Sequence, residues 1–225
     1  MAAALVVVVV VVLVGTGGGS SSSTTSSTTS DRTTLPSSSA TSIFSGIPQH
    51  GDTLGKATAP ATLLVFEDPQ CPFCKQFNIE TLPSVVSDFV RTGRVKLVWR
   101  GINIIGANSE PGLRAIFAAG NQNKLWQMAE AVYQRQGAEQ SGWITTALLT
   151  DAATAAGAKS APLLSASSSA AVTAQLKNAE NEATADAIRG TPSFVLQQAP
   201  AQPQQLNVTS LDPAAFSATL ASALQ

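Results

Sequence analysis

The 225-residue sequence has few cysteines, few histidines and little charge. Its two cysteines are Cys71 and Cys74, and its one histidine is His50. Two cysteines three positions apart can close only one very short loop, so packing rather than a long-range disulfide must stabilise the fold. A Cys-x-x-Cys is also half of a zinc knuckle, but tetrahedral zinc needs about four ligands and the chain offers no others nearby. We therefore expect no metal site.

Charged residues make up only 12% of the sequence and the formal net charge is −1. A binding partner with a phosphate backbone or an anionic membrane surface would require a basic patch, so nucleic acid is not expected as a partner. The chain is long enough for one domain of roughly 180 residues beside a low-complexity end. We expect a single folded unit.

The N-terminal end is an unbroken apolar run over residues 2–14, and no charged residue precedes Asp31. At ~1.5 Å per residue the run spans about 20 Å, short of a ~30 Å hydrocarbon core, which favours a signal peptide; continued through Gly19, it gives a marginal anchor. No Lys or Arg precedes the run, which leaves open whether the sequence is truncated at its start. We expect residues 1–19 to be a signal peptide or membrane anchor, and the protein to be extracytoplasmic, either secreted or anchored to the cell membrane.

Residues 20–42 are almost entirely Ser and Thr. This composition buries too little apolar area to offset the entropy of ordering the chain. We interpret the segment as a disordered linker that holds the folded domain, residues 43–225, just off a membrane. An inert tail left after processing is the alternative.

The folded domain begins with a strand, helix, strand pattern. Residues 62–67 are apolar on both faces, as is typical of a central strand, and a helix is predicted from Cys71 to Gly93, kinked or split by Pro83. A second strand is predicted at 95–102. The region around His50, and residues 52–60, are expected to be loop.

The next part of the domain is alanine-rich, with apolar residues at helical spacing that predict three to five helices. Strand patterns resume at 193–196 and, more weakly, at 205–208. Asp212 and Pro213 form the start of a last helix. The order is therefore an α/β fold with a helical insertion at about 104–187 between its βαβ and ββα halves.

The Cys-x-x-Cys lies where the first strand passes into the helix, which indicates a redox dithiol. In the first helical turn the two sulfurs can point at each other, so a disulfide can form with little backbone movement. Cys71 lies at the helix N-terminus, where unpaired N–H groups lower the thiol pKa, and is the expected nucleophile. Cys74 lies one turn further on, where it is shielded and can resolve a mixed disulfide. Pro72 costs nothing, because its N–H would be unpaired anyway.

This pattern, with the motifs at residues 66–74 and 190–194, resembles the exported DsbA-like thiol:disulfide oxidoreductases of the thioredoxin superfamily, of the tethered type of Gram-positive bacteria. The resemblance covers roughly residues 45–225 and implies a thioredoxin fold with an inserted α-helical subdomain. It also implies that Thr191–Pro192 is cis and presents a backbone edge to the substrate peptide. The alternative is an ordinary trans proline that opens a strand. No organic cofactor is implied.

Two positions depart from the family pattern. Phe73 stands where many relatives have a histidine that stabilises the thiolate, so we predict a weaker oxidant. Val65 stands where relatives often bury an acid that relays protons to the resolving cysteine. Glu67, on the same strand face, can substitute as the relay; otherwise it is a solvated or capping carboxylate.

The sequence therefore predicts an enzyme that exchanges disulfides with cysteine pairs of exported proteins through Cys71 and Cys74. We expect an oxidase, monomeric, re-oxidised by a membrane partner that passes electrons to quinone. A reductase or isomerase of exported proteins, and a tethered module that binds unfolded chains, remain alternatives. The direction depends on the reduction potential, which the sequence does not fix.

Overall fold

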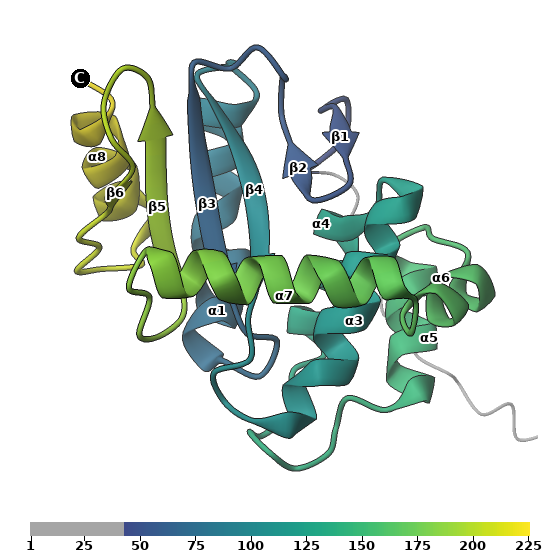
Figure 1. The fold of residues 1–225 in the computed structure, drawn as a ribbon. Helices are drawn as coiled ribbons and strands as arrows, with labels where there is room; N and C mark the ends of the chain where they lie inside the picture. Colours follow the sequence, from purple (N-terminus) through teal and green to yellow (C-terminus); the bar gives the residue numbers. More distant parts are fainter. Residues whose placement is uncertain (1–42) are drawn as a thin grey trace, which may run out of the picture. The chain divides into compact units, whose positions relative to one another are not determined.

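The computed structural model describes residues 43–225. The predicted signal or anchor segment and the Ser/Thr-rich linker lie outside these residues and stay predictions. Within the described part, none of the helices combines the length and apolar character needed to cross a membrane. A six-stranded mixed sheet in the order β1-β2-β4-β3-β5-β6 forms the framework, with helices packed on it (Figure 1).

The central strand of this sheet is β3 (Ala61–Glu67). It pairs in parallel with β4 (Val95–Gly101) and antiparallel with β5 (Ser193–Gln198). Every residue of β3 except Thr62 is buried, which explains why both of its faces are apolar. The predicted strands of the βαβ and ββα halves are therefore present and adjacent.

Three two-residue strands lie toward the edges of the sheet: β1 (Gln49–His50), β2 (Thr53–Leu54) and β6 (Gln204–Gln205). The first two were expected to be loop, because segments this short have no alternation to detect. They form a hairpin that pairs with β4. The predicted strand at 205–208 is shorter than expected and shifted toward the N-terminus, although the Leu206 amide still donates to the Phe194 carbonyl at 2.8 Å.

The helix after β3 is divided into α1 (Pro72–Gln76), a π-helical turn η1 (Phe77–Thr81), α2 (Leu82–Val85) and a second π turn η2 (Val86–Val90). Proline cannot donate the next backbone hydrogen bond, so a break near Pro83 was expected. The chain accommodates it by a change of hydrogen-bond register, and the Leu82 amide donates to the Phe77 carbonyl. Gly93, at φ +80°, ends the segment.

The inserted helices lie between β4 and β5. They are the short 3₁₀ turns η3 (Ala107–Ser109) and η4 (Gly120–Gln122), and the five α-helices α3 (Glu110–Ala119), α4 (Leu125–Gln134), α5 (Thr146–Ala155), α6 (Ser160–Ala166) and α7 (Ala170–Ala185). In Figure 1, α7 crosses in front of the sheet and α1 lies behind it. Helix α4 contacts α1 and η1, so the insertion reaches the segment that carries the cysteines. The predicted order of a βαβ half, a helical insertion and a ββα half is therefore present.

The last helix, α8 (Pro213–Ala223), contacts α2 and η1. The Asp212 carboxylate accepts from the Ala214 and Ala215 amides at 3.0 Å, which is the predicted N-cap. The Phe216 ring packs on Phe77 and Phe194, with ring centroids 5.4 and 4.8 Å away. This aromatic cluster ties α8 to the sheet and to the cysteine-bearing helix.

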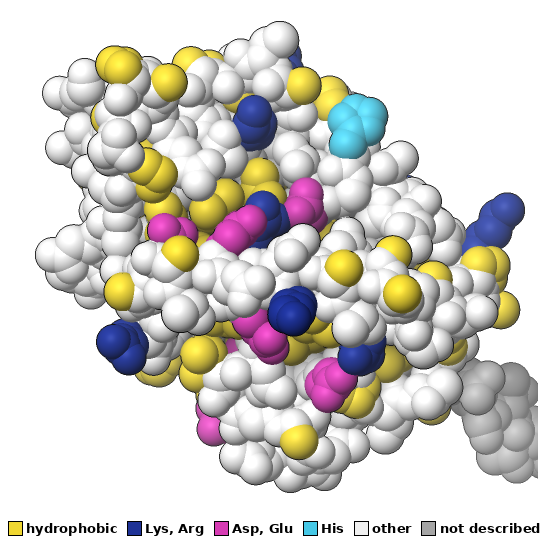
Figure 2. Space-filling model, in the orientation of Figure 1, with side chains coloured by type: hydrophobic (Ala, Val, Ile, Leu, Met, Phe, Trp, Pro, Cys, Tyr) yellow, Lys and Arg dark blue, Asp and Glu magenta, His cyan; other side chains and the backbone are white. Residues whose placement is uncertain are grey.

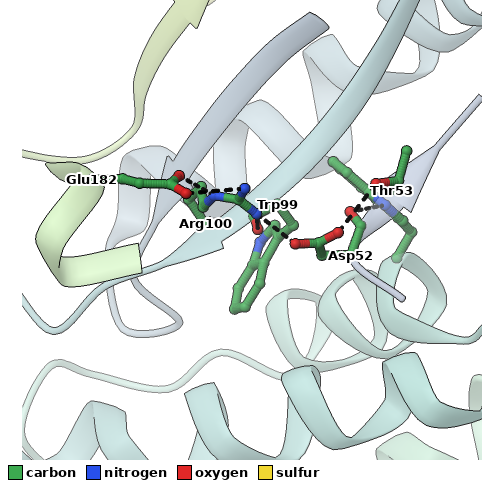
Figure 3. A network of polar contacts seen from close by, with 6 residues as sticks. Asp52, Thr53, Trp99, Arg100 and Glu182 are labelled. Atoms are coloured by element: carbon green, nitrogen blue, oxygen red, sulfur yellow. Dashed lines mark hydrogen bonds and ion pairs between the residues drawn. The ribbon is translucent and has the colours of Figure 1, made fainter. Parts of the chain in front are cut away.

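Arg100 on β4 joins three elements (Figure 3). Its guanidinium forms ion pairs with Asp52, which precedes β2, and with Glu182 of α7. The Asp52 carbonyl in turn accepts from the Trp99 amide at 3.0 Å. Charged side chains are otherwise sparse on this face of the molecule, as Figure 2 shows. The network therefore fixes α7 to the sheet at one of its few charged positions.

Candidate active site

The first cysteine lies at the boundary between a turn and a helix. Cys71 is the N-cap of α1, with extended backbone dihedrals (φ −71°, ψ 119°), and Pro72 is the first helical residue. The Cys71 amide donates to the Asp68 carbonyl at 3.0 Å, which closes the turn between β3 and α1. Cys71 therefore lies at the N-terminal end of α1, where the amides of the first helical turn favour a thiolate.

Both cysteines are free thiols. Cys71 retains 4% exposure and Cys74 has none, so the second sulfur is shielded, as the spacing predicts. The Cys71 thiol donates to the Thr191 carbonyl at 3.1 Å, and the Thr191–Pro192 peptide bond is cis. The structure thus brings together the two motifs that lie 120 residues apart in the sequence.

The two thiol pKa values move in opposite directions. A hydrogen bond from Cys74 is the largest contribution that lowers the pKa of Cys71 from 9.0 to about 6; burial opposes it, and Thr191 and the amides of Phe73 and Cys74 add to it. Burial, the hydrogen bond to Cys71 and the Glu67 charge raise the pKa of Cys74 well above 9.0. At neutral pH, Cys71 is therefore largely a thiolate and Cys74 keeps its proton.

Glu67 is the last residue of β3 and is completely buried. Its two oxygens accept hydrogen bonds from Trp99 Nε1 at 2.7 Å and from Asn78 Nδ2 at 2.5 Å. Desolvation raises the pKa of its carboxyl from 4.5 to about 8, against the effect of these bonds. Glu67 is thus neither solvated nor a helix cap, and the alternative to the relay interpretation is wrong on this point.

Asn78 connects Glu67 to Cys74. The same Nδ2 that donates to Glu67 also donates to the Cys74 carbonyl at 2.9 Å. Val65, at the position where relatives often have an acid, is fully buried in the core. In this chain the acid therefore stands two residues later, at Glu67, and is buried on the same strand face as Val65.

A second buried carboxylate, Asp68, organises the turn before Cys71. It accepts from the amides of Gln70, Ile104 and Ile105 at 2.9 Å, and from the Ser109 hydroxyl at 2.6 Å. This network was not predicted, because no local sequence pattern relates Asp68 to a loop some 36 residues later. An acid between a strand and a Pro-Gln-Cys turn was the one available signal.

Gln136, just after α4, also holds this turn. Its Nε2 donates to the carbonyls of Pro69 and Cys71, each at 2.9 Å. The Gln140 amide donates to Gln70 Oε1 at 2.6 Å. The helical insertion therefore fixes the backbone of Cys71, a role that no pattern in the sequence indicates.

A pocket of about 270 Å³ lies beside the dithiol. Phe73, which is 63% exposed, lines it together with Thr191, Pro192 and the segment 208–211 that precedes α8. None of the residues that line it is charged.

The described part of the chain, residues 43–225, contains no group of three or more His, Cys, Asp or Glu side chains arranged to hold a metal ion.

Comparison with known proteins places this site in context. A family model described as Thioredoxin matches residues 49–210, more than half of the chain. The probable disulfide bond formation protein D of Bacillus cereus is 33% identical over 98 residues, which are 43% of this chain and 45% of that protein. The chain thus spans about half the length of the curated relative that it matches.

Two solved structures share the fold. The oxidised BdbD of Bacillus subtilis has a TM-score of 0.66 at 22% identity and covers 79% of this chain and 97% of that one. The DsbA of Chlamydia trachomatis has a TM-score of 0.63 at 21% identity, covering 79% and 94%. Together the matches confirm the resemblance to DsbA-like thiol:disulfide oxidoreductases, and the two structures show the shared fold, whereas the exported and tethered type stays a prediction.

Proposed function

Because this chain belongs to the thioredoxin family, we propose that it is an exported thiol:disulfide oxidoreductase that oxidises cysteine pairs of secreted proteins through Cys71 and Cys74. The observation that carries the proposal is the geometry of the pair: Cys71 is the N-cap of α1, with its sulfur 3.1 Å from the Thr191 carbonyl oxygen, and Cys74, one turn further on, is fully buried. The opposite pKa shifts, down to about 6 at Cys71 and upward at Cys74, support it. Stabilising the Cys71 thiolate stabilises the reduced dithiol, which makes its disulfide a stronger oxidant.

The reaction begins with the Cys71–Cys74 disulfide. A substrate thiolate attacks Cys71 Sγ, the Cys71–Cys74 bond breaks, and Cys74 leaves as a thiolate that takes up a proton. The second substrate thiolate then attacks the substrate sulfur of the mixed disulfide and releases Cys71 as a thiolate. The substrate has lost two electrons and the dithiol has gained them. The low pKa of Cys71 favours this second step because a more acidic thiol leaves faster.

Glu67 is the proposed source of the proton for Cys74. With a pKa of about 8 its carboxyl is mostly protonated at neutral pH, so it can act as an acid toward the leaving thiolate. Its burial and the shared contact with Asn78 support this role. Glu67 then recovers a proton before the next cycle.

Thr191, Pro192 and Phe73 are the proposed contacts for the substrate. The pocket that they line lies next to Cys71, and its uncharged lining suits an extended, largely apolar peptide around the substrate cysteine. Because its ring is exposed, Phe73 can contact the peptide directly, although it gives no hydrogen bond to the thiolate.

The partners follow from the proposed direction. An oxidase must be re-oxidised, and we propose a membrane protein that passes the electrons to quinone. The described chain would act as a monomer outside the cytoplasm, held near the membrane by its N-terminal segment or released by cleavage. The Bacillus cereus relative is named as a probable disulfide bond formation protein, which supports oxidation over reduction.

The test is disulfide transfer to a reduced peptide with two cysteines. The oxidised full chain should form one peptide disulfide for each Cys71–Cys74 disulfide that it loses, and Cys71→Ser should form none. The double variant Cys71→Ser/Cys74→Ser is the control for a binding module, because it keeps the peptide surface without the chemistry. Peptide oxidation by the double variant at the wild-type rate would overturn the proposal.

A further inference from the structure

A buried hydroxyl of the helical insertion lies unpaired beside the candidate active site. Tyr133, on α4, has no exposed surface, and its phenol oxygen has no hydrogen-bond partner among the described residues. A buried hydroxyl without a partner costs free energy, so such groups are rare in folded proteins. In the sequence, Tyr133 is one of the residues of the apolar stripe of its helix. Packing of this stripe against the core explains why the ring is buried, but it does not explain why the hydroxyl is.

The charged groups that influence this hydroxyl lie in the segment from β3 to α1. Burial and the negative charges of Glu67, Cys74, Asp68 and Cys71 raise the pKa of Tyr133 well above 10.0. Tyr133 in turn is one of the groups that lower the pKa of Glu67, although it lies outside normal hydrogen-bond geometry in this state. On its own helix the nearest acid is Glu130, which is engaged with Gln134 at 3.2 Å. The phenol is therefore an uncommitted donor that lies close to the acid.

Glu67 needs a further donor only after it gives up its proton. As a carboxylic acid it accepts one hydrogen bond on each oxygen, from Asn78 and from Trp99. As a carboxylate in the same dry site, it carries a full charge with only these two neutral donors, which is too few to replace the water it has lost. A small movement of the phenol would supply a third donor at that moment.

We propose that Tyr133 is a positioning residue whose hydroxyl donates a hydrogen bond to the Glu67 carboxylate formed when Glu67 protonates the leaving Cys74 thiolate. The inference rests on the proposed function. In this step the proton moves from a Glu67 oxygen to Cys74 Sγ, and the phenol proton stays on Tyr133. The electron pair of the broken Cys71–Cys74 bond stays on Cys74 sulfur, where it accepts the proton.

The variant Tyr133→Phe tests this directly, because it removes the hydroxyl and keeps the buried ring. We expect peptide oxidation at neutral pH to slow several-fold and the falling limb of the pH profile, near pH 8 in the wild type, to move to higher pH. The thiolate titration of Cys71, near pH 6, should not change. Ser217→Ala is the matched control, since it removes another unpaired buried hydroxyl, on α8, and should leave both profiles unchanged. A Tyr133→Phe profile identical to that of the wild type would overturn the inference.

A second measurement needs neither catalysis nor the variant. Tyr133 is the single tyrosine of the chain, so the tyrosine ring modes in the infrared spectrum report on this hydroxyl alone. In the reduced wild-type protein they should change to those of a hydrogen-bond donor as pH rises through about 8, and Glu67→Gln should abolish the change. Modes that stay constant across this titration would contradict the inference. Failure of peptide oxidation in the wild type, with the infrared change present, would instead refute only the proposed function.

Discussion

Cys71 and Cys74 are chemically identical side chains one helical turn apart, and their surroundings separate them. Cys71 lies at the helix start with free amides and the Cys74 thiol around it, whereas Cys74 faces the core, Glu67 and no solvent. One sulfur is therefore stabilised as a thiolate and the other as a thiol. This separation, rather than the presence of two cysteines, is what makes the pair directional.

The Cys74 thiol is the largest single support of the Cys71 thiolate, so its removal should be visible in a titration. We expect Cys74→Ala to raise the pKa of Cys71 from about 6 toward its ordinary value, because the hydrogen bond from Cys74 is lost. Thiolate absorbance against pH measures it. Cys74→Ser is the matched control, since its hydroxyl can still donate and should give a smaller rise. A midpoint in Cys74→Ala equal to that of the wild type would show that the helix N-terminus and Thr191 suffice.

Glu67 should make the stability of the reduced protein depend on pH. Its folded-state pKa of about 8 exceeds the ordinary 4.5, so the folded protein binds the proton more tightly than the unfolded chain. The resulting stabilisation is complete below about pH 4.5 and is lost as pH rises to about 8, by on the order of a few kcal/mol. Cys71 contributes with the opposite sign between about pH 6 and 9, because its pKa is lowered.

The variant Glu67→Gln isolates the contribution of the acid. Both proteins contain Cys71, so its contribution cancels when their urea unfolding free energies are compared. The wild-type value minus the variant value should fall as pH rises from 4.5 to 8, because only the wild type loses the stabilisation from protonated Glu67. The amide keeps the size of the side chain and can still accept from Trp99. A difference that is constant over this range would mean that the folded-state pKa of Glu67 is close to its ordinary value.

At the scale of elements, the strands and helices that bury many apolar residues were predictable from the sequence. The strand 62–67, the helix start at Cys71 and the N-cap at Asp212 all follow from local pattern, and the structure has them. The hairpin of β1 and β2 was not predictable, because two-residue strands depend on pairing with β4 rather than on their own periodicity.

The site divides in the same way. The cysteine pair is a local motif that its spacing identifies, and the Thr191–Pro192 loop is a local motif that the resemblance to DsbA-like proteins indicates. The contacts of Asp68, Gln136 and Tyr133 depend on how the insertion packs against the turn, and packing between distant segments leaves no mark in a single sequence. Glu67 was only partly predictable. Its place on the strand next to the cysteine pair follows from the sequence, but its complete burial depends on how neighbouring segments pack around it.

Replacing Arg100 tests whether the ion pairs between α7 and the sheet stabilise the fold. Its side chain is 18% exposed and bridges Asp52 and Glu182, so Arg100→Met should lower the unfolding free energy by about 1–2 kcal/mol, with part of the loss screened by salt in the wild type. Urea unfolding measures it. Lys177→Met is the control, as an exposed residue of the same helix that has no ion pair among residues 43–225, and should change stability by less than about 0.5 kcal/mol. Equal effects of the two substitutions would show that the network contributes nothing specific.

At the scale of the whole molecule, the thioredoxin half supplies the dithiol and the insertion supplies the groups that hold it. Gln136 donates to the Cys71 carbonyl, and Tyr133 of α4 is one of the groups that change the pKa of Glu67. The insertion is therefore part of the site and not only a cover for the sheet.

The most direct test of an oxidase is the reduction potential of the Cys71–Cys74 couple, measured by equilibrating the purified chain in glutathione buffers. A lowered Cys71 pKa without a histidine at position 73 predicts a potential above about −200 mV but below the roughly −120 mV of the strongest oxidases. A value near −270 mV, as in thioredoxin, would contradict the oxidase and identify a reductase instead.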